Sequence, residues 1–177
     1  MNTVSRLILI FILIAGCNKK SKDQRFIEYI NDPENKITQV IKIGETQATM
    51  KLMTDEYRAF LNKTEIVSDD TGYYYFNATF SKNTGTKPEK EKVMYLNFDM
   101  QNDFVLLVKQ DSILPSICQK IENGKPGNYE YLLAFKKSHS LSEETFTVFY
   151  HDKIFGIGSI AFVYRQEDID KIPTLLN

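Results

Sequence analysis

Alternating apolar and polar residues run through most of the chain after residue 36, and this period of two predicts β-strands. Ala48, Met50 and Leu52 alternate with polar neighbours, while Tyr74 and Phe76 begin a second alternating run. A period of two places the apolar residues on one face of a strand. The expected strands are residues 36–43, 47–53, 73–80, 92–98, 104–108 and 129–135, followed by a hairpin over residues 145–164 that turns at Asp152-Lys153.

Three short segments have the spacing of an amphipathic helix instead. Phe26 and Ile30 share one face of the first segment, and Thr54 is a candidate N-cap for the second. Residues 110–122 are ambiguous, because their apolar spacing suits a helix but Pro115 interrupts it. The expected helices are residues 25–31, 54–63 and 165–172.

Together these elements predict a single α+β domain, built mainly from antiparallel β-sheet with about eight strands and a few short helices. The chain contains ten tyrosines and twelve phenylalanines but no tryptophan, and this richness in aromatic residues favours the same β-rich class. No internal repeat and no linker marks a second domain boundary. We therefore expect one hydrophobic core.

The first seventeen residues follow a different pattern, with an unbroken apolar run from Leu7 to Ile14. Arg6 precedes this run, and Ala15-Gly16 lead from it directly into Cys17. A run of this length rises about 12 Å as a helix, much less than the roughly 30 Å of hydrocarbon in a bilayer. The run is therefore typical of the apolar region of a signal peptide and not of a membrane-spanning helix.

The tetrad Ile14-Ala15-Gly16-Cys17 resembles the lipobox of bacterial lipoproteins. The resemblance implies cleavage before Cys17, a diacylglyceryl group on its sulfur and usually a third acyl chain on its new amino group. Two or three acyl chains attach a protein stably to a membrane, whereas one does not. The expected organisation is a signal peptide at residues 1–16, the lipidated cysteine and a polar tether at residues 17–24, and a globular domain at residues 25–177. An ordinary secretory signal with a cysteine near its end is the alternative interpretation.

Asn18 and the charge balance bear on the partners of the mature protein. In well-studied diderm lipoproteins, aspartate after the lipidated cysteine retains the protein at the inner membrane, so Asn18 implies the outer membrane if the host is diderm. The chain has 22 basic and 23 acidic residues, and the leader removes only the basic Arg6, which leaves a net charge of −2. This balance gives no reason to expect nucleic acid as a partner.

Cys118 is the second of the two cysteines and has no partner within the chain if Cys17 is lipidated. No internal disulfide is then possible, so the hydrophobic core must hold the fold. Cys118 lies among apolar residues without an identifiable basic neighbour, whereas a reactive thiol needs its pKa lowered by such a group. We expect a buried structural thiol.

Candidate catalytic and metal-binding residues are few. His139 and His151 are the only histidines, and their spacing fits no zinc motif. His151 precedes Asp152, but adjacent residues of a strand point to opposite faces. The oxygen-rich residues 99–103 (DMQND) lack the spacing of a calcium loop and are interpreted as a turn. Residues 156–161 match G-x-G-x-x-A, but β-forming residues follow, so the match is interpreted as accidental. We expect no catalytic residue, no metal site and no cofactor.

Tyr73 and Tyr75 are the candidate binding residues. If Tyr74 and Phe76 face the core, the period of two sends Tyr73 and Tyr75 to the opposite face of the strand. Exposed tyrosines there would suit contact with a protein or a sugar, because they bury a large area at a low entropic cost. The alternative is that a second sheet or helices cover this face as well.

These observations predict a membrane-anchored envelope lipoprotein that is a non-enzymatic binding or assembly component. Its expected partners are the membrane, through the acyl chains on Cys17, and an envelope protein. Two alternatives stay open: an envelope enzyme of the hydrolase type with a dispersed site, and an immunity or inhibitor lipoprotein that neutralises a toxin at the membrane. A deep pocket lined by carboxylates or by His151 would favour the enzyme, and a flat tyrosine-rich sheet face the binder.

Overall fold

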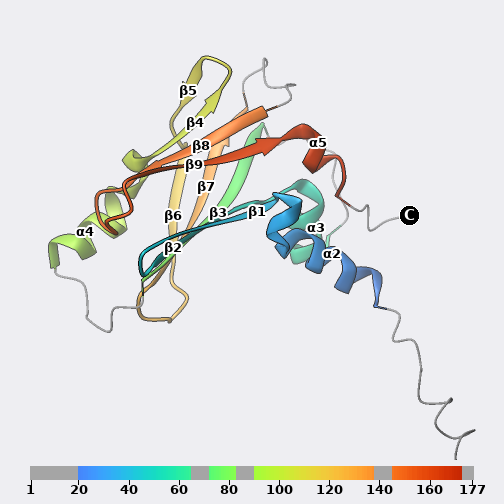
Figure 1. Ribbon diagram of the computed structural model, residues 1–177, viewed down its shortest axis with the longest axis horizontal. Helices are drawn as coiled ribbons and strands as arrows, with labels where there is room; N and C mark the ends of the chain where they lie inside the picture. The colour runs from blue at the N-terminus through green and yellow to red at the C-terminus, as the bar shows by residue number, and fades with distance from the viewer. Residues whose placement is uncertain (1–19, 65–71, 83–89, 138–144, 173–177) are drawn as a thin grey trace, which may run out of the picture.

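The computed structural model describes residues 20–64, 72–82, 90–137 and 145–172, and it has an α+β fold built on two antiparallel sheets (Figure 1). Within these residues, one sheet has the strand order β1-β2-β3-β7-β6 and the other the order β5-β4-β8-β9. The predicted fold class is confirmed, with the strands divided between two sheets. The strands are β1 (Thr38–Ile43), β2 (Thr46–Leu52), β3 (Tyr73–Lys82), β4 (Phe104–Val108), β5 (Asp111–Ile113), β6 (Ile117–Ile121), β7 (Asn128–Lys136), β8 (Thr145–His151) and β9 (Ser159–Arg165).

The core lies between the two sheets, where inward-facing aromatic rings meet. Between ring centroids, Phe76 of β3 lies 6.2 Å from Phe146 of β8, and Phe80 of β3 lies 4.5 Å from Tyr150 of β8. In β2 and in residues 76–80 of β3, the even-numbered residues are the buried ones. The alternation in the sequence therefore marks the strand face that meets the other sheet.

Helix α2 (Lys22–Asn31) begins three residues before its predicted start. Ser21 and Gln24 form a capping box, in which each side chain accepts a hydrogen bond from the backbone N–H of the other. Phe26 and Ile30 are buried as predicted, and the Phe26 ring lies 5.5 Å from the ring of Phe60 in the next helix. Helix α2 and its cap therefore include residues 21–24, which the sequence assigned to the polar tether.

The other two predicted helices are present. Helix α3 (Asp55–Asn62) is capped by Thr54 as predicted, because the Thr54 hydroxyl accepts a hydrogen bond from the backbone N–H of Tyr57. Helix α5 (Gln166–Ile169) is shorter than the predicted span of residues 165–172. The predicted hairpin at residues 145–164 is also present as β8 and β9.

Residues 92–98, predicted as a strand, belong to helix α4 (Lys90–Phe98) instead. Of the three apolar residues that alternate here, only Leu96 is buried, while Met94 and Phe98 are exposed. The hydroxyl of Tyr131 in β7 donates a hydrogen bond of 2.9 Å to the backbone carbonyl of Leu96. Three alternating apolar residues are a weak strand signal, and the burial of only one of them fits a helix that contacts a distant strand.

Residues 110–122 form strands β5 and β6, not a helix. Strand β5 turns back on β4, with Leu106 opposite Ile113, whereas β6 pairs with β7 of the other sheet. Pro115 lies between the two strands, where its missing N–H interrupts no ladder. The chain therefore crosses from one sheet to the other within this segment, a change that periodicity does not reveal.

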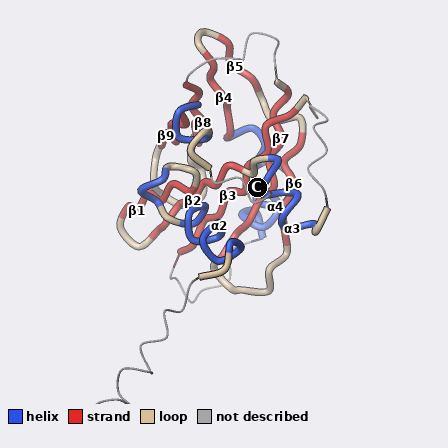
Figure 2. The backbone as a smooth tube through the Cα atoms, turned by 90° about the vertical axis from the view of Figure 1, so that its right-hand side faces the viewer, coloured by secondary structure: helices blue, strands red, loops and turns tan. Residues whose placement is uncertain are grey.

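The two sheets pack face to face as a sandwich. Along one side of this sandwich, β1 and β2 of the first sheet contact β9 of the second. The Gln39 side chain of β1 donates to the carbonyl of Val163 at 2.7 Å and accepts from its N–H at 3.2 Å, and the Tyr164 hydroxyl donates to the carbonyl of Met50 at 2.9 Å. Figure 2 shows β1 and β9 towards one side of the molecule and β6 towards the other. Helix α4 contacts strands β6 and β7.

Candidate functional site

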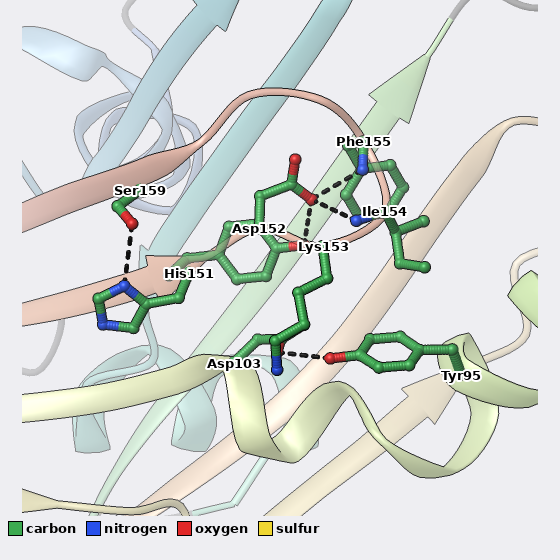
Figure 3. A network of polar contacts seen from close by, with 9 residues as sticks. Tyr95, Asp103, His151, Asp152, Lys153, Ile154, Phe155 and Ser159 are labelled. Carbon is green, nitrogen blue, oxygen red and sulfur yellow. Dashed lines mark hydrogen bonds and ion pairs between the residues drawn. The ribbon is translucent and has the colours of Figure 1, made fainter.

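The candidate functional site lies where the loop between β8 and β9 meets α4 and the short 3-10 helix η2 (Met100–Asp103). Its central residue, Asp103, has no exposed surface. The Oδ1 atom of Asp103 accepts a hydrogen bond of 2.6 Å from the Tyr95 hydroxyl and lies 2.8 Å from Nζ of Lys153 (Figure 3). Within the described part of the chain, Oδ2 has no hydrogen-bond partner. Buried polar atoms are almost always paired, so this carboxylate is the first candidate for a functional group.

The two partners of Asp103 keep their protons at neutral pH. Hydrogen bonding to Asp103 and its negative charge raise the pKa of Lys153, so the ammonium group stays charged. Burial raises the pKa of Tyr95, and the hydrogen bond to Asp103 adds to the rise, so the phenol stays neutral. At neutral pH, Lys153 is therefore a cation and the Tyr95 hydroxyl a hydrogen-bond donor. Since both groups keep their protons, neither can act as a general base.

Sequence reasoning missed Tyr95 and Lys153 as neighbours of Asp103. Asp103 was predicted as a turn residue, Tyr95 belonged to the segment predicted as a strand, and Lys153 lay at the expected hairpin turn. Their separation in the sequence leaves no local signal of contact. The sequence offers one indication of a site here: the carboxylates of Asp99 and Asp103 lie directly before a predicted strand.

Asp152 organises the loop that carries Lys153. Its Oδ1 accepts hydrogen bonds from the backbone N–H groups of Ile154 and Phe155 at 2.9 and 2.7 Å and from the Tyr150 hydroxyl at 3.0 Å. Its Oδ2 accepts from the N–H of Ile157 at 2.7 Å. Burial alone would raise the pKa of Asp152, but the backbone hydrogen bonds and the Tyr150 hydroxyl outweigh it and lower the pKa. This carboxylate is fully used in holding the loop.

Three further side chains near Asp103 are protonated at neutral pH and therefore unreactive as nucleophiles: Cys118, Tyr131 and Tyr150. Burial raises the pKa of the half-buried Cys118 thiol to about 12, with a smaller contribution from the charge of Asp103. Burial also raises the pKa of Tyr131 and of Tyr150 above the ordinary value for tyrosine. At neutral pH the Cys118 sulfur is a thiol, which is a poor nucleophile.

His151 and Ser159 form a cross-strand pair on the exposed side of the same hairpin. Nδ1 of His151 lies 3.0 Å from the Ser159 hydroxyl, and the two residues are register partners in β8 and β9. Asp152 bonds to the loop and to Tyr150 and not to His151, as the opposite facing of adjacent residues predicts. The histidine ring stacks 6.1 Å from Phe149, and among the described residues no carboxylate is hydrogen-bonded to the pair.

Tyr73 and Tyr75 lie on the outer face of the five-stranded sheet, opposite the core, as the period of two predicts. Both are half-buried rather than exposed. Their rings are 6.2 Å apart, and the guanidinium of Arg58 in α3 lies 4.3 Å from the centre of the Tyr75 ring. The cation covers one face of the Tyr75 ring, so this ring is not a free flat surface.

The remaining sequence candidates give no assembled site. Cys17 and His139 lie outside the described residues. Asp99 is exposed while Asp103 is buried, and no group of three or more His, Cys, Asp or Glu side chains in the described ranges could hold a metal ion. After Gly156 and Gly158 the chain enters strand β9 and not a helix, so the G-x-G-x-x-A segment lacks the helix N-terminus that a dinucleotide site uses.

An open depression of about 520 Å³ lies beside α5. Its described lining is polar and consists of Thr145, Arg165, Gln166, Glu167 and Asp170. A guanidinium nitrogen of Arg165 is 3.3 Å from a carboxylate oxygen of Glu167, which pairs the cation within the wall. All five of these lining residues are polar or charged, in contrast with the largely apolar lining of typical small-molecule sites.

Comparison with known proteins adds one distant structural likeness. The chain matches no protein-family model and no curated protein. A crystal structure at 1.90 Å resolution of a protein of unknown function from Burkholderia pseudomallei is similar over 88% of this chain and 90% of that chain, with 10% sequence identity and a TM-score of 0.45. This likeness carries no argument about function. Among the described helices, none has the length and apolar character needed to cross a membrane.

Proposed function

We propose that this protein is a lipid-anchored component of a bacterial cell envelope that acts by binding another envelope component. The observation that carries the proposal is the leader that ends Ile14-Ala15-Gly16-Cys17, followed four residues later by the Ser21 capping box of α2. Four extended residues reach at most about 14 Å. Acyl chains on Cys17 would therefore hold the folded domain close to the bilayer surface.

The polar groups of the candidate site are engaged in contacts within the protein, which favours a non-enzymatic role. Asp152 is used in holding its own loop, and Asp103 is paired with Lys153 and Tyr95. Cys118 holds its proton, and within the part of the chain that the structure describes no carboxylate bonds to His151 of the His151–Ser159 pair. These contacts support a site whose polar groups stabilise one end of the sandwich.

Membrane fractionation of the full chain tests the anchor. We expect the wild-type protein in the membrane fraction and Cys17→Ser either in the soluble fraction or as an uncleaved precursor, because the thioether bond cannot form on serine. Cys118→Ser is the matched control and should stay with the membrane, since the leader is unchanged. Wild-type protein that is already soluble would contradict the proposal.

The membrane to which the anchor binds is a separate question. Asn18 in place of aspartate supports the outer membrane in a diderm host. Separation of the two membranes on a sucrose gradient should therefore place the wild-type protein with outer-membrane markers. Asn18→Asp should shift the protein towards the inner membrane, and a wild-type protein in the inner-membrane fraction would overturn the assignment.

A further inference from the structure

The described strands leave four sheet edges, of which β9 and β5 are protected and β1 lies against β9. Strands β1 and β9 are joined through the Gln39 side chain, which satisfies both backbone groups of Val163. Strand β5 has only three residues and begins with a charged residue. Short strands, charges and covering groups are the usual devices that keep sheet edges from pairing with other chains. Strand β6 is the fourth edge, and it pairs only with β7 among the described strands.

The outer face of β6 is apolar at both ends and symmetric about its centre. Ile117 and Ile121 are 44% and 36% exposed and lie two residues on either side of Gln119, which is also exposed. Half-buried Leu132 of β7 is the register partner of Gln119 and extends the same face. Exposed apolar residues on an edge strand favour addition of another strand.

We propose that β6 pairs with β6 of a second copy of this chain, antiparallel and centred on Gln119. In this register Ile117 of each copy faces Ile121 of the other, and the two Gln119 amides face one another and can donate and accept reciprocally. The five-stranded sheets of the two copies become one continuous sheet. The proposal builds on the lipid anchor described under Proposed function.

The charges of β6 are compatible with this pairing. Lys120 faces the core side of the strand, and its Nζ lies 2.8 Å from a carboxylate oxygen of Glu122 and 3.0 Å from the side-chain oxygen of Asn97 in α4. Centred on Gln119, the pairing places Lys120 opposite Cys118 of the other copy and not opposite another cation. No like charges meet directly across the strands.

The position of the anchor also fits the pairing. A two-fold axis that makes two copies of one strand antiparallel neighbours in a sheet runs perpendicular to that sheet, so both outer faces point the same way. The C-terminal end of α2 contacts this outer face: the Thr38 hydroxyl donates to the carbonyl of Ile30 at 2.7 Å, and Lys51 donates to Asn31 at 2.6 Å. The α2 helices of the two copies therefore lie on the same side of the paired sheets, as one bilayer that holds both anchors requires.

Site-directed disulfide formation in the native membrane tests the pairing. Residues directly opposite in an antiparallel pair have Cα atoms about 4.5–5.5 Å apart, within the range that a disulfide spans. In full-length lipidated protein, we expect Gln119→Cys to give a disulfide-linked dimer on mild oxidation, several-fold more than Val163→Cys, a matched exposed position on β9. The wild-type protein, which retains Cys118, sets the background.

Charge substitutions in the Gln119→Cys chain test which surface is responsible. Ile117→Lys should strongly reduce the dimer, because two lysines would then face apolar residues, whereas Val40→Lys on the exposed face of β1 should leave it unchanged. Equal crosslinking of Gln119→Cys and Val163→Cys would overturn the inference, as would a crosslinked product that does not have twice the mass of the chain. Membrane fractionation of the same samples reports separately on the anchor.

Discussion

The ammonium group of Lys153, on a side chain that is 57% exposed, lies 2.8 Å from a carboxylate oxygen of Asp103, a residue with no exposed surface. The pair joins the β8–β9 loop to η2, and Tyr95 of α4 donates to the same oxygen. One buried carboxylate thus connects three segments that local structure would leave independent. The second oxygen of Asp103 finds no partner among the described residues.

We predict that Asp103→Asn lowers the free energy of unfolding by about 1–3 kcal/mol, because the amide loses the ion pair and still leaves a buried polar group unpaired. Urea unfolding of the Cys17→Ser chain followed by circular dichroism measures this loss. Asp99→Asn is the matched control, since Asp99 is exposed and makes no side-chain cap to η2. Equal unfolding midpoints for the two variants would show that Asp103 contributes no more than a surface carboxylate.

Asp152 should make part of the stability depend on acid pH. Its pKa is lower in the folded protein than the ordinary value of 3.8, so the unfolded chain binds the proton more readily. This contribution is fully present above about pH 4 and is lost as the pH falls through the folded pKa. Unfolding midpoints of the wild type and Asp152→Asn, measured from pH 7 down to pH 2.5, should converge towards the acid end.

The Asp152 measurement is decided by the direction in which the stability difference between wild type and Asp152→Asn changes with pH. Asp152→Asn removes the titrating group, so its destabilisation relative to the wild type should be largest at neutral pH and smaller in acid. Asp168→Asn, in helix α5 and outside this loop, serves as the control. A difference between wild type and Asp152→Asn that grows as the pH falls would contradict the lowered pKa.

The two faces of β3 should respond differently to truncation. Phe76 is fully buried between the sheets, and Phe76→Ala should cost about 3–5 kcal/mol. Tyr75 is half-buried under Arg58, and Tyr75→Ala should cost clearly less, because solvent already reaches part of the ring and a cation–π contact near the surface contributes only about 0.5–1 kcal/mol. Chemical denaturation of both variants gives the comparison. Equal, large losses would mean that the outer face is as closely packed as the core.

Residues whose surroundings follow from strand or helix period alone were predictable from the sequence. Met50 and Phe76 face the core because alternate side chains of a strand point to one face, and Thr54 caps α3 because its oxygen accepts from an N–H in the first helical turn. These relations involve neighbours a few residues apart, so no knowledge of the tertiary structure is needed. The prediction that Cys17 carries the anchor likewise rests on a local motif.

The tertiary structure alone decided which distant residues meet. Residues 92–98 lie in helix α4, where Leu96 and Tyr95 contact residues of other elements, and residues 110–122 form two strands, each of which pairs with a different sheet. The contact between Asp103 and Lys153 and the cover of Arg58 over Tyr75 are of the same kind. The period of the chain determines which face of an element is apolar, whereas the packing of elements distant in sequence determines which groups lie within hydrogen-bonding distance.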